Sequence, residues 1–492
     1  MWQLQETFKR RESPCLGRRQ VRVTLAALAL AAGLVAGWGS VKAEAAEASG
    51  ELTLDERFNE LYYGNLEAQE TRNGIGLTKE QMLEDYDYLY RSIRENWPYV
   101  GVARRKAGAD LDASYKEGRM RLEAAGTDVD FYIEVSKLVD SMKGIGHLSV
   151  YDPYTVSSEV RGYKQYQDSG QWPEELDWYR PWIADWLSDP VVRNESAWKE
   201  LLKASFSSAY DQTMEEFGID QGNAAENVHT EIIEEGKTAY LSIAAFDMDS
   251  YDEDKEILFD FYRQVADYDN LIIDIRENGG GGMPYYMDLI VAPNTEKDLC
   301  WLNYVFVKDG EINRKYNSDL HEVFFSLDTP VDQIREQMLK SWSGRQREAV
   351  EPLLEHIGVP EKMNQEDLKE LDLYAPDVMY IESLNGERMF QGKIWVLVSG
   401  NVYSSSESFA SFCKTTGWAA LVGTRTGGDG IGSDPLMIVL PNSGLVSRYA
   451  WIYGTVQDGT GSEEFGTEPD YISGPGESAL ETCLRLIREN GR

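Results

Sequence analysis

The 492-residue chain is poor in the residue types that build metal centres and disulfide frameworks. It has 4 cysteines and 4 histidines. Cys15 precedes an apolar N-terminal run, so only Cys300, Cys413 and Cys483 remain for a folded domain. An odd number of widely spaced cysteines excludes a dense disulfide framework. No C-x-x-C, H-E-x-x-H or EF-hand loop occurs, so we expect no metal and no cofactor.

Positive charge is also scarce. The chain has 48 Lys and Arg residues against 84 Asp and Glu residues, which gives a formal net charge of −36. A chain this acidic repels the phosphates of nucleic acids and anionic lipid headgroups. We therefore expect no nucleic-acid partner, and no membrane contact beyond a possible N-terminal anchor. The sequence leaves the oligomeric state open.

Long hydrophobic runs are limited to one, at residues 23–38. Arg18, Arg19 and Arg22 precede this run, and small residues follow it, with Val41 and Ala43 spaced as at a cleavage site. This pattern is typical of a secretory signal, and an uncleaved N-terminal anchor is the alternative. We predict a signal peptide at residues 1–43 and an exported protein, either extracellular or in the cell envelope.

The rest of the chain divides into three parts by pattern, with 42% hydrophobic residues to supply a core. Residues 44–151 predict a helical N-terminal subdomain, with helices at 77–96, 109–125 and 131–143. Residues 152–227 are rich in tryptophan and predict an inserted segment of helices and loops. Residues 228–492 alternate apolar strands with helices, including strands at 271–275, 393–399 and 446–453. This alternation predicts an α/β (α+β) fold.

One segment places serine hydroxyls where an anion could be stabilised. The run V-L-V-S-G-N-V-Y-S-S-S-E-S-F-A-S-F at 396–412 predicts a strand, a short turn and a helix. A hydroxyl in that turn lies beside unpaired helix N–H groups and the positive end of the helix dipole. The alternative is that Ser404, Ser405 and Ser406 only cap the helix.

Two further segments carry residues of the kind that nucleophilic catalysis needs. Four glycines, 279–282, follow the predicted strand at 271–275, so their backbone N–H groups could approach a substrate carbonyl, or they could form a flexible turn. His147 follows Gly144 and Gly146 and could act as a base, although a lone histidine is more often structural. An acidic residue in the run at 461–470 could orient a histidine.

Taken together, these segments resemble one family, the peptidases that include the C-terminal processing (tail-specific) proteases and the tricorn core protease. The resemblance rests on four motifs in order, which together span about residues 228–473. These are D-I-R-E-N-G-G-G at 274–281, S-S-S-E-S-F-A at 404–410, A-A-L-V-G-T-R-T-G-G at 419–428 and F-G-T-E-P-D at 465–470.

The resemblance implies a mixed-sheet core of the ClpP/crotonase type and a serine-type endopeptidase that acts on polypeptides. It implies Ser404 as the nucleophile that forms an acyl-enzyme. It also implies that the backbone N–H groups of Gly280, Gly281 and Ser405 hold the oxyanion.

One departure decides which branch of the family the chain resembles. The processing proteases have a lysine base in a turn that follows the nucleophile, and Asp429 stands at that position here. The tricorn-like branch uses histidine and glutamate, which implies His147 as base and Glu463 as its orienting carboxylate, with Glu464 as the alternate. Tricorn also has a serine before its histidine, where this chain has Gly146, and no peptide-binding PDZ module is evident between 152 and 227.

Two other functions remain open from the sequence. The chain could be a catalytically inactive peptidase-fold protein that binds peptides or cell-wall material, which the aspartate at 429 favours. It could also be an unrelated surface-binding protein that uses the Trp-rich insert as a platform. An esterase of the α/β-hydrolase type is disfavoured because no G-x-S-x-G occurs.

Overall fold

The computed structural model describes residues 54–124, 126–170, 172, 179–217, 226–355, 357–384 and 386–490. The predicted signal at 1–43 lies outside these ranges. No helix within them is long and apolar enough to span a bilayer.

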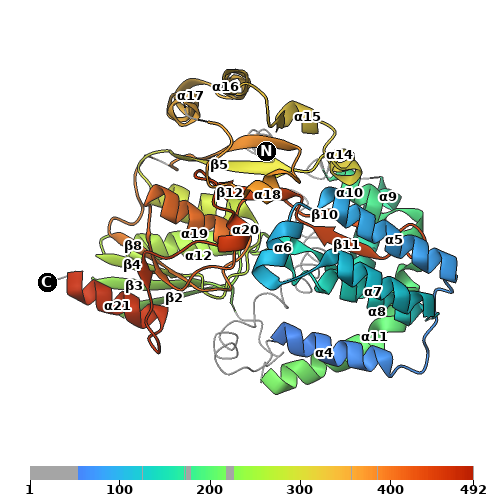
Figure 1. The fold of residues 1–492 in the computed structure, drawn as a ribbon. Helices are drawn as coiled ribbons and strands as arrows, with labels where there is room; N and C mark the ends of the chain where they lie inside the picture. The colour runs from blue at the N-terminus through green and yellow to red at the C-terminus, as the bar shows by residue number, and fades with distance from the viewer. Residues whose placement is uncertain are drawn as a thin grey trace.

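In the described part of the chain, five α-helices precede the first strand and lie together on one side of the molecule (Figure 1). They are α4 (Leu54–Glu67), α5 (Lys79–Asn96), α6 (Val100–Ala107), α7 (Leu111–Ala124) and α8 (Asp128–Asp140). Capping boxes led by Thr78 and Thr127 begin α5 and α8 by pairing the first free backbone N–H groups. Three of the five, α5, α7 and α8, correspond to the helices predicted at 77–96, 109–125 and 131–143. The sequence pattern did not predict α6.

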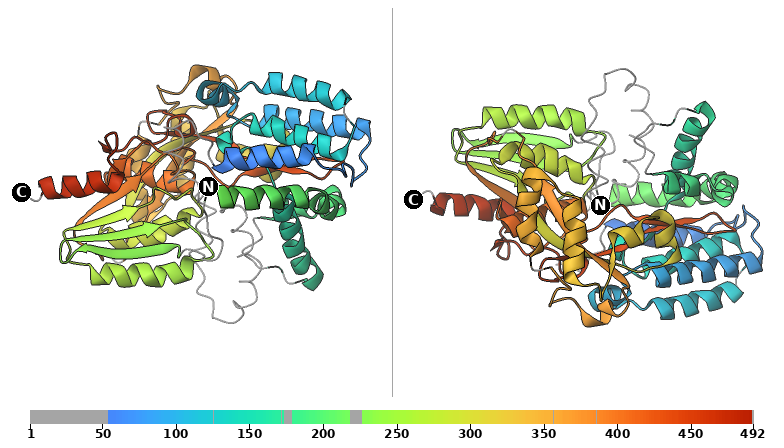
Figure 2. Two further views of the ribbon diagram at one scale, coloured as in Figure 1. Left: turned by 90° about the horizontal axis from the view of Figure 1, so that it is seen from below. Right: turned by 90° about the horizontal axis from the view of Figure 1, so that it is seen from above.

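The Trp-rich segment is helical and packs onto these helices and a neighbouring hairpin. It forms α9 (Pro153–Ser169), α10 (Arg180–Trp186) and α11 (Asp189–Phe217), and α11 lies along α4 (Figures 1 and 2). The indole N–H of Trp198 donates to the Ser443 carbonyl at 2.9 Å, and that of Trp182 donates to the Pro435 carbonyl at 3.2 Å. These two tryptophans therefore anchor the insert to the rest of the fold.

A six-stranded sheet organises the C-terminal half, in the order β13-β9-β8-β4-β3-β2. Its strands are β2 (Val228–Glu234), β3 (Thr238–Ile243), β4 (Asn270–Asp274), β8 (Lys393–Val398), β9 (Ala420–Gly423) and β13 (Tyr471–Ile472). All neighbours are parallel except β2, which pairs antiparallel with β3 at one edge. Strand β4 is buried on both faces, as its continuous apolar sequence predicts.

Helices cover both faces of this sheet. One face packs α12 (Tyr251–Gln264) and α19 (Ser405–Thr416), and the other packs α21 (Ala479–Asn490) (Figure 1). Because Asp274 pairs with Leu397, strands β4 and β8 end side by side. The glycine turn after β4 and the serine turn after β8 therefore meet at one edge of the sheet, where open α/β sheets bind ligands.

Two smaller antiparallel sheets join this half to the helical part. One has the order β12-β5-β7-β6, and the other has the order β1-β11-β10. Their strands are β1 (Ser149–Val150), β5 (Leu299–Val307), β6 (Phe325–Ser326), β7 (Leu373–Ile381), β10 (Leu436–Val439), β11 (Val446–Tyr449) and β12 (Ile452–Val456). The fold is thus mixed α/β with parallel and antiparallel strands, as predicted.

The single strand predicted at 446–453 is wrong in one respect, because it is two strands in two sheets. Strand β11 pairs with β10 up to Tyr449, and β12 pairs with β5 from Ile452. Ala450 and Trp451 carry the chain between them, and the N–H of Ala450 donates to the Gly146 carbonyl at 2.6 Å. The switch between sheets therefore lies directly beside the turn that carries His147.

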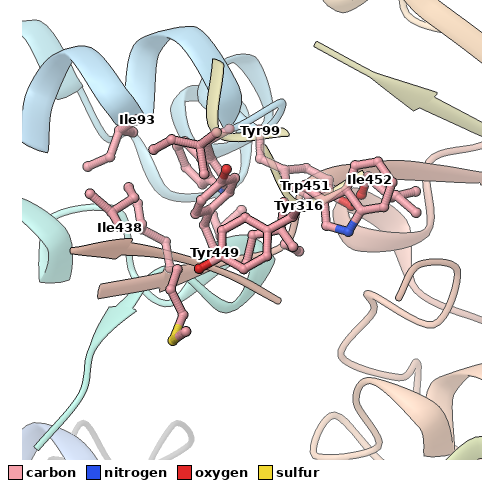
Figure 3. Close-up of a cluster of buried hydrophobic side chains, with 14 of the residues drawn as sticks. Ile93, Tyr99, Tyr316, Ile438, Tyr449, Trp451 and Ile452 are labelled. Atoms are coloured by element: carbon pink, nitrogen blue, oxygen red, sulfur yellow. The ribbon is translucent and has the colours of Figure 1, made fainter. Parts of the chain in front are cut away.

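A continuous apolar core links the helical part to these two sheets. Figure 3 shows Ile93 and Tyr99 from the helical part against Ile438 and Tyr449 of β10 and β11, with Ile452 from β12 nearby. The remaining helices include α13 (Met283–Tyr285), the π-helix η3 (Tyr286–Val291), α14 (Glu311–Tyr316), α16 (Val331–Lys340), α17 (Gly344–Val350), α18 (Gln365–Leu368) and α20 (Ser462–Phe465). Because the helices and the two antiparallel sheets bury their apolar side chains against each other, we expect each to stabilise the position of the other.

Candidate active site

Ser404 lies in the turn between β8 and α19, where its backbone is strained. Its φ and ψ are 58° and −127°, a conformation that L-residues rarely adopt. Its N–H donates to the Gly428 carbonyl at 3.1 Å, which fixes the turn. Its side chain makes no capping bond to the helix, and its hydroxyl has no hydrogen-bond partner among the described residues. The alternative that Ser404 only caps α19 is therefore wrong.

The other two serines of the run have different environments. The Ser406 hydroxyl donates to the Asn278 carbonyl at 2.5 Å and accepts from the Tyr403 N–H at 3.1 Å, so it ties the serine turn to the glycine turn. The Ser405 hydroxyl is buried without a partner in the described part of the chain. Of the three hydroxyls, that of Ser404 is the one left both accessible and unbonded.

The glycine turn packs directly against Ser404. A Cβ on Gly280 would lie 2.8 Å from the Ser404 Cβ, and one on Gly281 would lie 2.1 Å from the Phe246 carbonyl oxygen. Both residues have positive φ, 118° and 134°. Only glycine permits this approach and this backbone.

The three predicted oxyanion donors differ in their availability. The Gly280 N–H donates to the Asn278 side-chain oxygen at 2.9 Å, so it is already used. The N–H groups of Gly281 and Ser405 make no hydrogen bond within the described residues. Ser405 is also the first residue of α19, where the helix dipole is positive. These two N–H groups are the ones free to bind an oxyanion.

His147 lies on a tight turn at 143–147, next to Tyr403, the residue before Ser404. Its φ is 54°, and the preceding Gly146 packs so closely on Tyr99 that a Cβ there would lie 2.4 Å from the ring. The imidazole contacts the Tyr403 ring edge-on, with centroids 5.2 Å apart. The structure thus brings His147 beside the residue that precedes Ser404, although no hydrogen bond joins the two side chains.

Burial and the positive charge of Arg448 lower the pKa of His147 to about 3. The imidazole is therefore neutral at neutral pH, which is the form that can accept a proton. Its Nε2 lies 3.3 Å from Oδ2 of Asp429. Burial also raises the pKa of the Asp429 carboxyl well above its ordinary value, and the nearby Glu463 adds to this rise. The imidazole and the Asp429 carboxyl group thus face each other in a buried position.

Glu463, the predicted orienting carboxylate, contacts other groups. It is 2% exposed and lies on the short helix α20. Its Oε2 accepts from the Tyr403 hydroxyl at 2.8 Å, and its Oε1 accepts from Lys106 Nζ at 3.1 Å. Burial raises the pKa of the Glu463 carboxyl group above its ordinary value, and Lys106 and the backbone N–H of Gly146, which also faces the group, oppose this rise. Glu463 therefore supports the turn that carries His147 rather than the imidazole itself.

The alternate carboxylate, Glu464, is committed elsewhere. Arg105 of α6 donates to both of its oxygens at 2.7 Å and also binds Asp367. Glu464 thus helps to hold α6 against α20, and it has no contact with His147 in the described structure.

Helix α6 contributes residues that the sequence did not single out. Lys106 Nζ donates to the Gly427 carbonyl at 3.0 Å and to the Glu463 carbonyl at 2.5 Å, besides its bond to the Glu463 carboxylate. Tyr99, just before α6, donates to the Ile452 carbonyl at 2.6 Å and lies 3.2 Å from Asp429 Oδ1. The basic run R-R-K at 104–106 in so acidic a chain was the available signal.

A cavity of about 240 Å³ opens next to these residues. It is lined by Lys106, Ala107, Lys143, Gly144, Ile145, Tyr403 and Glu463. The cavity therefore lies between α6, the turn that carries His147, and Tyr403, the residue before Ser404. No group of three or more histidine, cysteine, aspartate or glutamate side chains in the described ranges is placed to bind a metal ion.

Comparison with known proteins gives one family match and several solved structures. Residues 237–473 match the model of peptidase family S41, and no curated protein matches the chain. Among solved structures, mature CPAF is 13% identical, with a TM-score of 0.46 over 84% of this chain and 96% of that one. The photosystem II D1 C-terminal processing protease is 13% identical, with a TM-score of 0.38 over 85% and 98%. The tricorn protease is 13% identical, with a TM-score of 0.37 over 84% and 37%.

The family match carries the assignment, because it spans the strands and turns that hold the glycine turn, Ser404, Asp429 and Glu463. Over residues 237–473 the chain is thus similar to peptidase family S41, a family of serine peptidases.

Proposed function

We propose that the protein hydrolyses peptide bonds through an acyl-enzyme on Ser404, with His147 as the base. The observation that carries this proposal is the Ser404 turn, where an unbonded hydroxyl lies on strained backbone against Gly280, beside two unpaired N–H groups. Strain of this kind is retained where the surrounding structure enforces it, often at active sites.

The mechanism follows from the positions of these groups. His147 takes the Ser404 proton while Oγ attacks the carbonyl carbon of the scissile bond. The N–H groups of Gly281 and Ser405 hold the oxyanion of the tetrahedral intermediate. The imidazolium then protonates the leaving amine, and water hydrolyses the acyl-enzyme by the same route. The hydrogen bond from Ser404 to His147 forms with substrate bound, as is common for catalytic hydrogen bonds that are long in free enzymes.

Glu463 has a supporting role in this scheme. It accepts from the Tyr403 hydroxyl and faces the Gly146 N–H, so it joins the residue before the nucleophile to the residue before the base. Lys106 compensates its charge. Glu463 therefore orients His147 through the backbone on which the imidazole is mounted.

The substrate that we propose is a polypeptide cleaved internally outside the cytoplasm. Export rests on the arginines and the apolar run at residues 1–43. N-terminal sequencing of protein recovered from the culture medium or cell envelope tests this part. Recovery of the full-length chain only inside the cell would refute it.

A second candidate is a peptidase-fold protein that binds peptides without cleaving them. Asp429 in place of a lysine base favours it, as does the absence of a bond between Ser404 and His147. The same experiment separates the two functions, because a binder would leave Ser404 unreactive.

The test is labelling by a serine-reactive phosphonate, with peptide mapping of the adduct and a peptide-hydrolysis assay. We expect the adduct on Ser404 in the wild type and none in Ser404→Ala, since removing the nucleophile of a triad costs about 10⁶-fold in kcat. Ser207→Ala is the matched control, because Ser207 is exposed on α11. Labelling that persists in Ser404→Ala, or a wild type that neither labels nor cleaves peptides, would contradict the proposal.

A further inference from the structure

Position 429 holds a buried carboxylate that faces the proposed base. Asp429 Oδ2 lies 3.3 Å from Nε2 of His147, and Asp429 Oδ1 lies 3.2 Å from the Tyr99 hydroxyl. The residue is 8% exposed. A buried aspartate normally needs hydrogen-bond donors, and the imidazole and Tyr99 are the donors that its two oxygens face.

The backbone holds Asp429 in this position. Its φ is 57°, and it lies between Gly428 and Gly430. A Cβ on Gly428 would lie 2.8 Å from the Glu463 carbonyl oxygen, and one on Gly430 would lie 2.5 Å from Glu407 Cγ. Because the Gly428 carbonyl also accepts the Ser404 N–H, the carboxylate and the nucleophile are fixed relative to each other.

No other described carboxylate is as well placed to orient the imidazole. Glu463 is bound to Lys106 and Tyr403, and Glu464 is bound to Arg105. Each would have to give up existing bonds to reach the ring. Asp429 requires no such exchange, since one of its oxygens already lies beside Nε2.

We propose that Asp429 is the positioning residue for His147, accepting the Nε2–H bond and so fixing the tautomer whose Nδ1 takes the Ser404 proton. The inference rests on the proposed function for its catalytic meaning. In the reaction, the Ser404 proton moves to Nδ1 as the Oγ–C bond forms, and it then moves to the amine nitrogen as the C–N bond breaks. Asp429 gains and loses no atoms; it holds the ring and stabilises the imidazolium.

The groups that face Asp429 come from four other parts of the fold. They are His147 from its turn, the hydroxyls of Tyr99 and Tyr403, the Glu463 carboxylate and the Lys106 ammonium. Lys106 and the two hydroxyls favour the ionised carboxylate, whereas burial and Glu463 favour its protonated form. Protonation of His147 places a positive charge beside Asp429. The ionised form of Asp429 is therefore favoured most when His147 is protonated.

The first measurement needs no variant. Nitrogen NMR of ¹⁵N-histidine-labelled full-length protein distinguishes the Nε2–H from the Nδ1–H tautomer, and His147→Gln assigns the signal among four histidines. We expect the Nε2–H tautomer at position 147. The Nδ1–H tautomer in the wild type would overturn the inference whether or not the protein is a peptidase.

The second measurement compares two variants. Asp429→Asn keeps the shape and tolerates the positive φ. We expect it to lose the tautomer preference and to slow phosphonate labelling, by up to about 10⁴-fold as for the comparable aspartate of a serine-protease triad. Glu463→Gln should keep the Nε2–H tautomer. Circular dichroism and thermal melting establish that both variants fold.

The outcomes separate the inference from the function on which it rests. An unlabelled wild type refutes the acyl-enzyme, while its histidine tautomer still decides the role of Asp429. A folded Asp429→Asn variant that labels at the wild-type rate with an unchanged tautomer refutes the positioning role, while Ser404 stands as nucleophile. Loss of the tautomer in Glu463→Gln alone would assign the role to Glu463.

Discussion

At the scale of single residues, backbone strain marks the site more clearly than any side-chain contact. Four non-glycine residues in the described ranges have positive φ: Lys143, His147, Ser404 and Asp429. Three are the proposed base, nucleophile and positioning residue, and the fourth lines the adjacent cavity. Such conformations typically cost about 1–3 kcal/mol each. These strained conformations therefore lower the stability of the folded protein, and they set the positions of the residues that form the proposed site.

A second residue-scale feature is the buried carboxyl group of Glu407 beneath the nucleophile. It is 1% exposed, it accepts from the Thr467 hydroxyl at 2.7 Å, and its Oε2 has no partner in the described part of the chain. Burial raises the pKa of Glu407 to about 8. The folded protein thus keeps a proton that the unfolded chain releases near pH 4.5.

The sign of the resulting pH dependence is fixed by this raised pKa. The stabilising contribution is fully present below about pH 4.5 and is lost as the pH rises through about 8, on the order of a few kcal/mol in the free energy of unfolding. Glu407→Gln stays neutral, so we expect a flatter decline of stability between pH 5 and 8. Urea unfolding of both proteins across that range measures it. Parallel curves would show that Glu407 is ionised in the folded protein.

At the scale of elements, helix α6 connects the helical part to the segments that form the proposed site. Arg105 binds Asp367 and Glu464, and Lys106 binds Glu463 and the Gly427 carbonyl. The segments at Gly427 and at 463–464, before and after Asp429, are therefore both bound to one short helix from the N-terminal helical part.

Removing one of these contacts should loosen the loops. Lys106→Met keeps the length of the side chain but leaves the buried Glu463 without its cation. Because Lys106 is about a third exposed, we expect a loss of about 1–3 kcal/mol in the free energy of unfolding, and slower labelling of Ser404. The control is Arg104→Met, on an exposed residue of the same helix. Urea denaturation compares them, and equal losses in the two variants would exclude a specific clamp.

Helices and strands with a regular pattern of apolar residues were predictable from the sequence. Elements whose position depends on contacts with residues far away in the sequence were not. Strand β4 and helix α5 are evident from a buried apolar run and from helical spacing. Helix α6 is only eight residues long, and its charged side chains find their partners in short helices and a loop more than 260 positions away. The break between β11 and β12 likewise depends on which sheet each strand joins, which no local pattern specifies.

The same distinction applies to the site. Ser404, Gly281 and His147 could be singled out because a nucleophile turn, a glycine turn and a glycine-flanked histidine each leave a local pattern. The contact between Asp429 and His147 joins residues 147 and 429, and it depends on a ring orientation that only three-dimensional packing decides. The role of Lys106 was hidden because a charged residue near a helix end is usually solvated.

At the scale of the whole molecule, two apolar cores meet at the site. One core runs from the N-terminal helices through the two antiparallel sheets, and the other fills one face of the six-stranded sheet. His147, Tyr99 and Lys106 come from the first region, whereas Ser404 directly precedes helix α19, which packs into the second. The site is thus complete only while both regions are folded against each other.

This arrangement predicts that reactivity and helical structure are lost together. During urea unfolding, we expect phosphonate reactivity of Ser404 to disappear no later than the far-ultraviolet circular dichroism of the helices. Both quantities can be followed on one set of samples. Reactivity that survives after the helical signal has fallen would show that the sheet region holds a working site alone.

The order of the contributing segments along the chain has a consequence for how the protein is made. The proposed base, His147, precedes the proposed nucleophile, Ser404, by more than 250 residues, and Asp429 and Glu463 follow Ser404. The turn under His147 is closed by Ala450, which also follows Ser404. A growing polypeptide on the ribosome therefore carries His147 and Ser404 before it carries Asp429, Ala450 and Glu463, so the proposed site can assemble only after the last of these segments has been made.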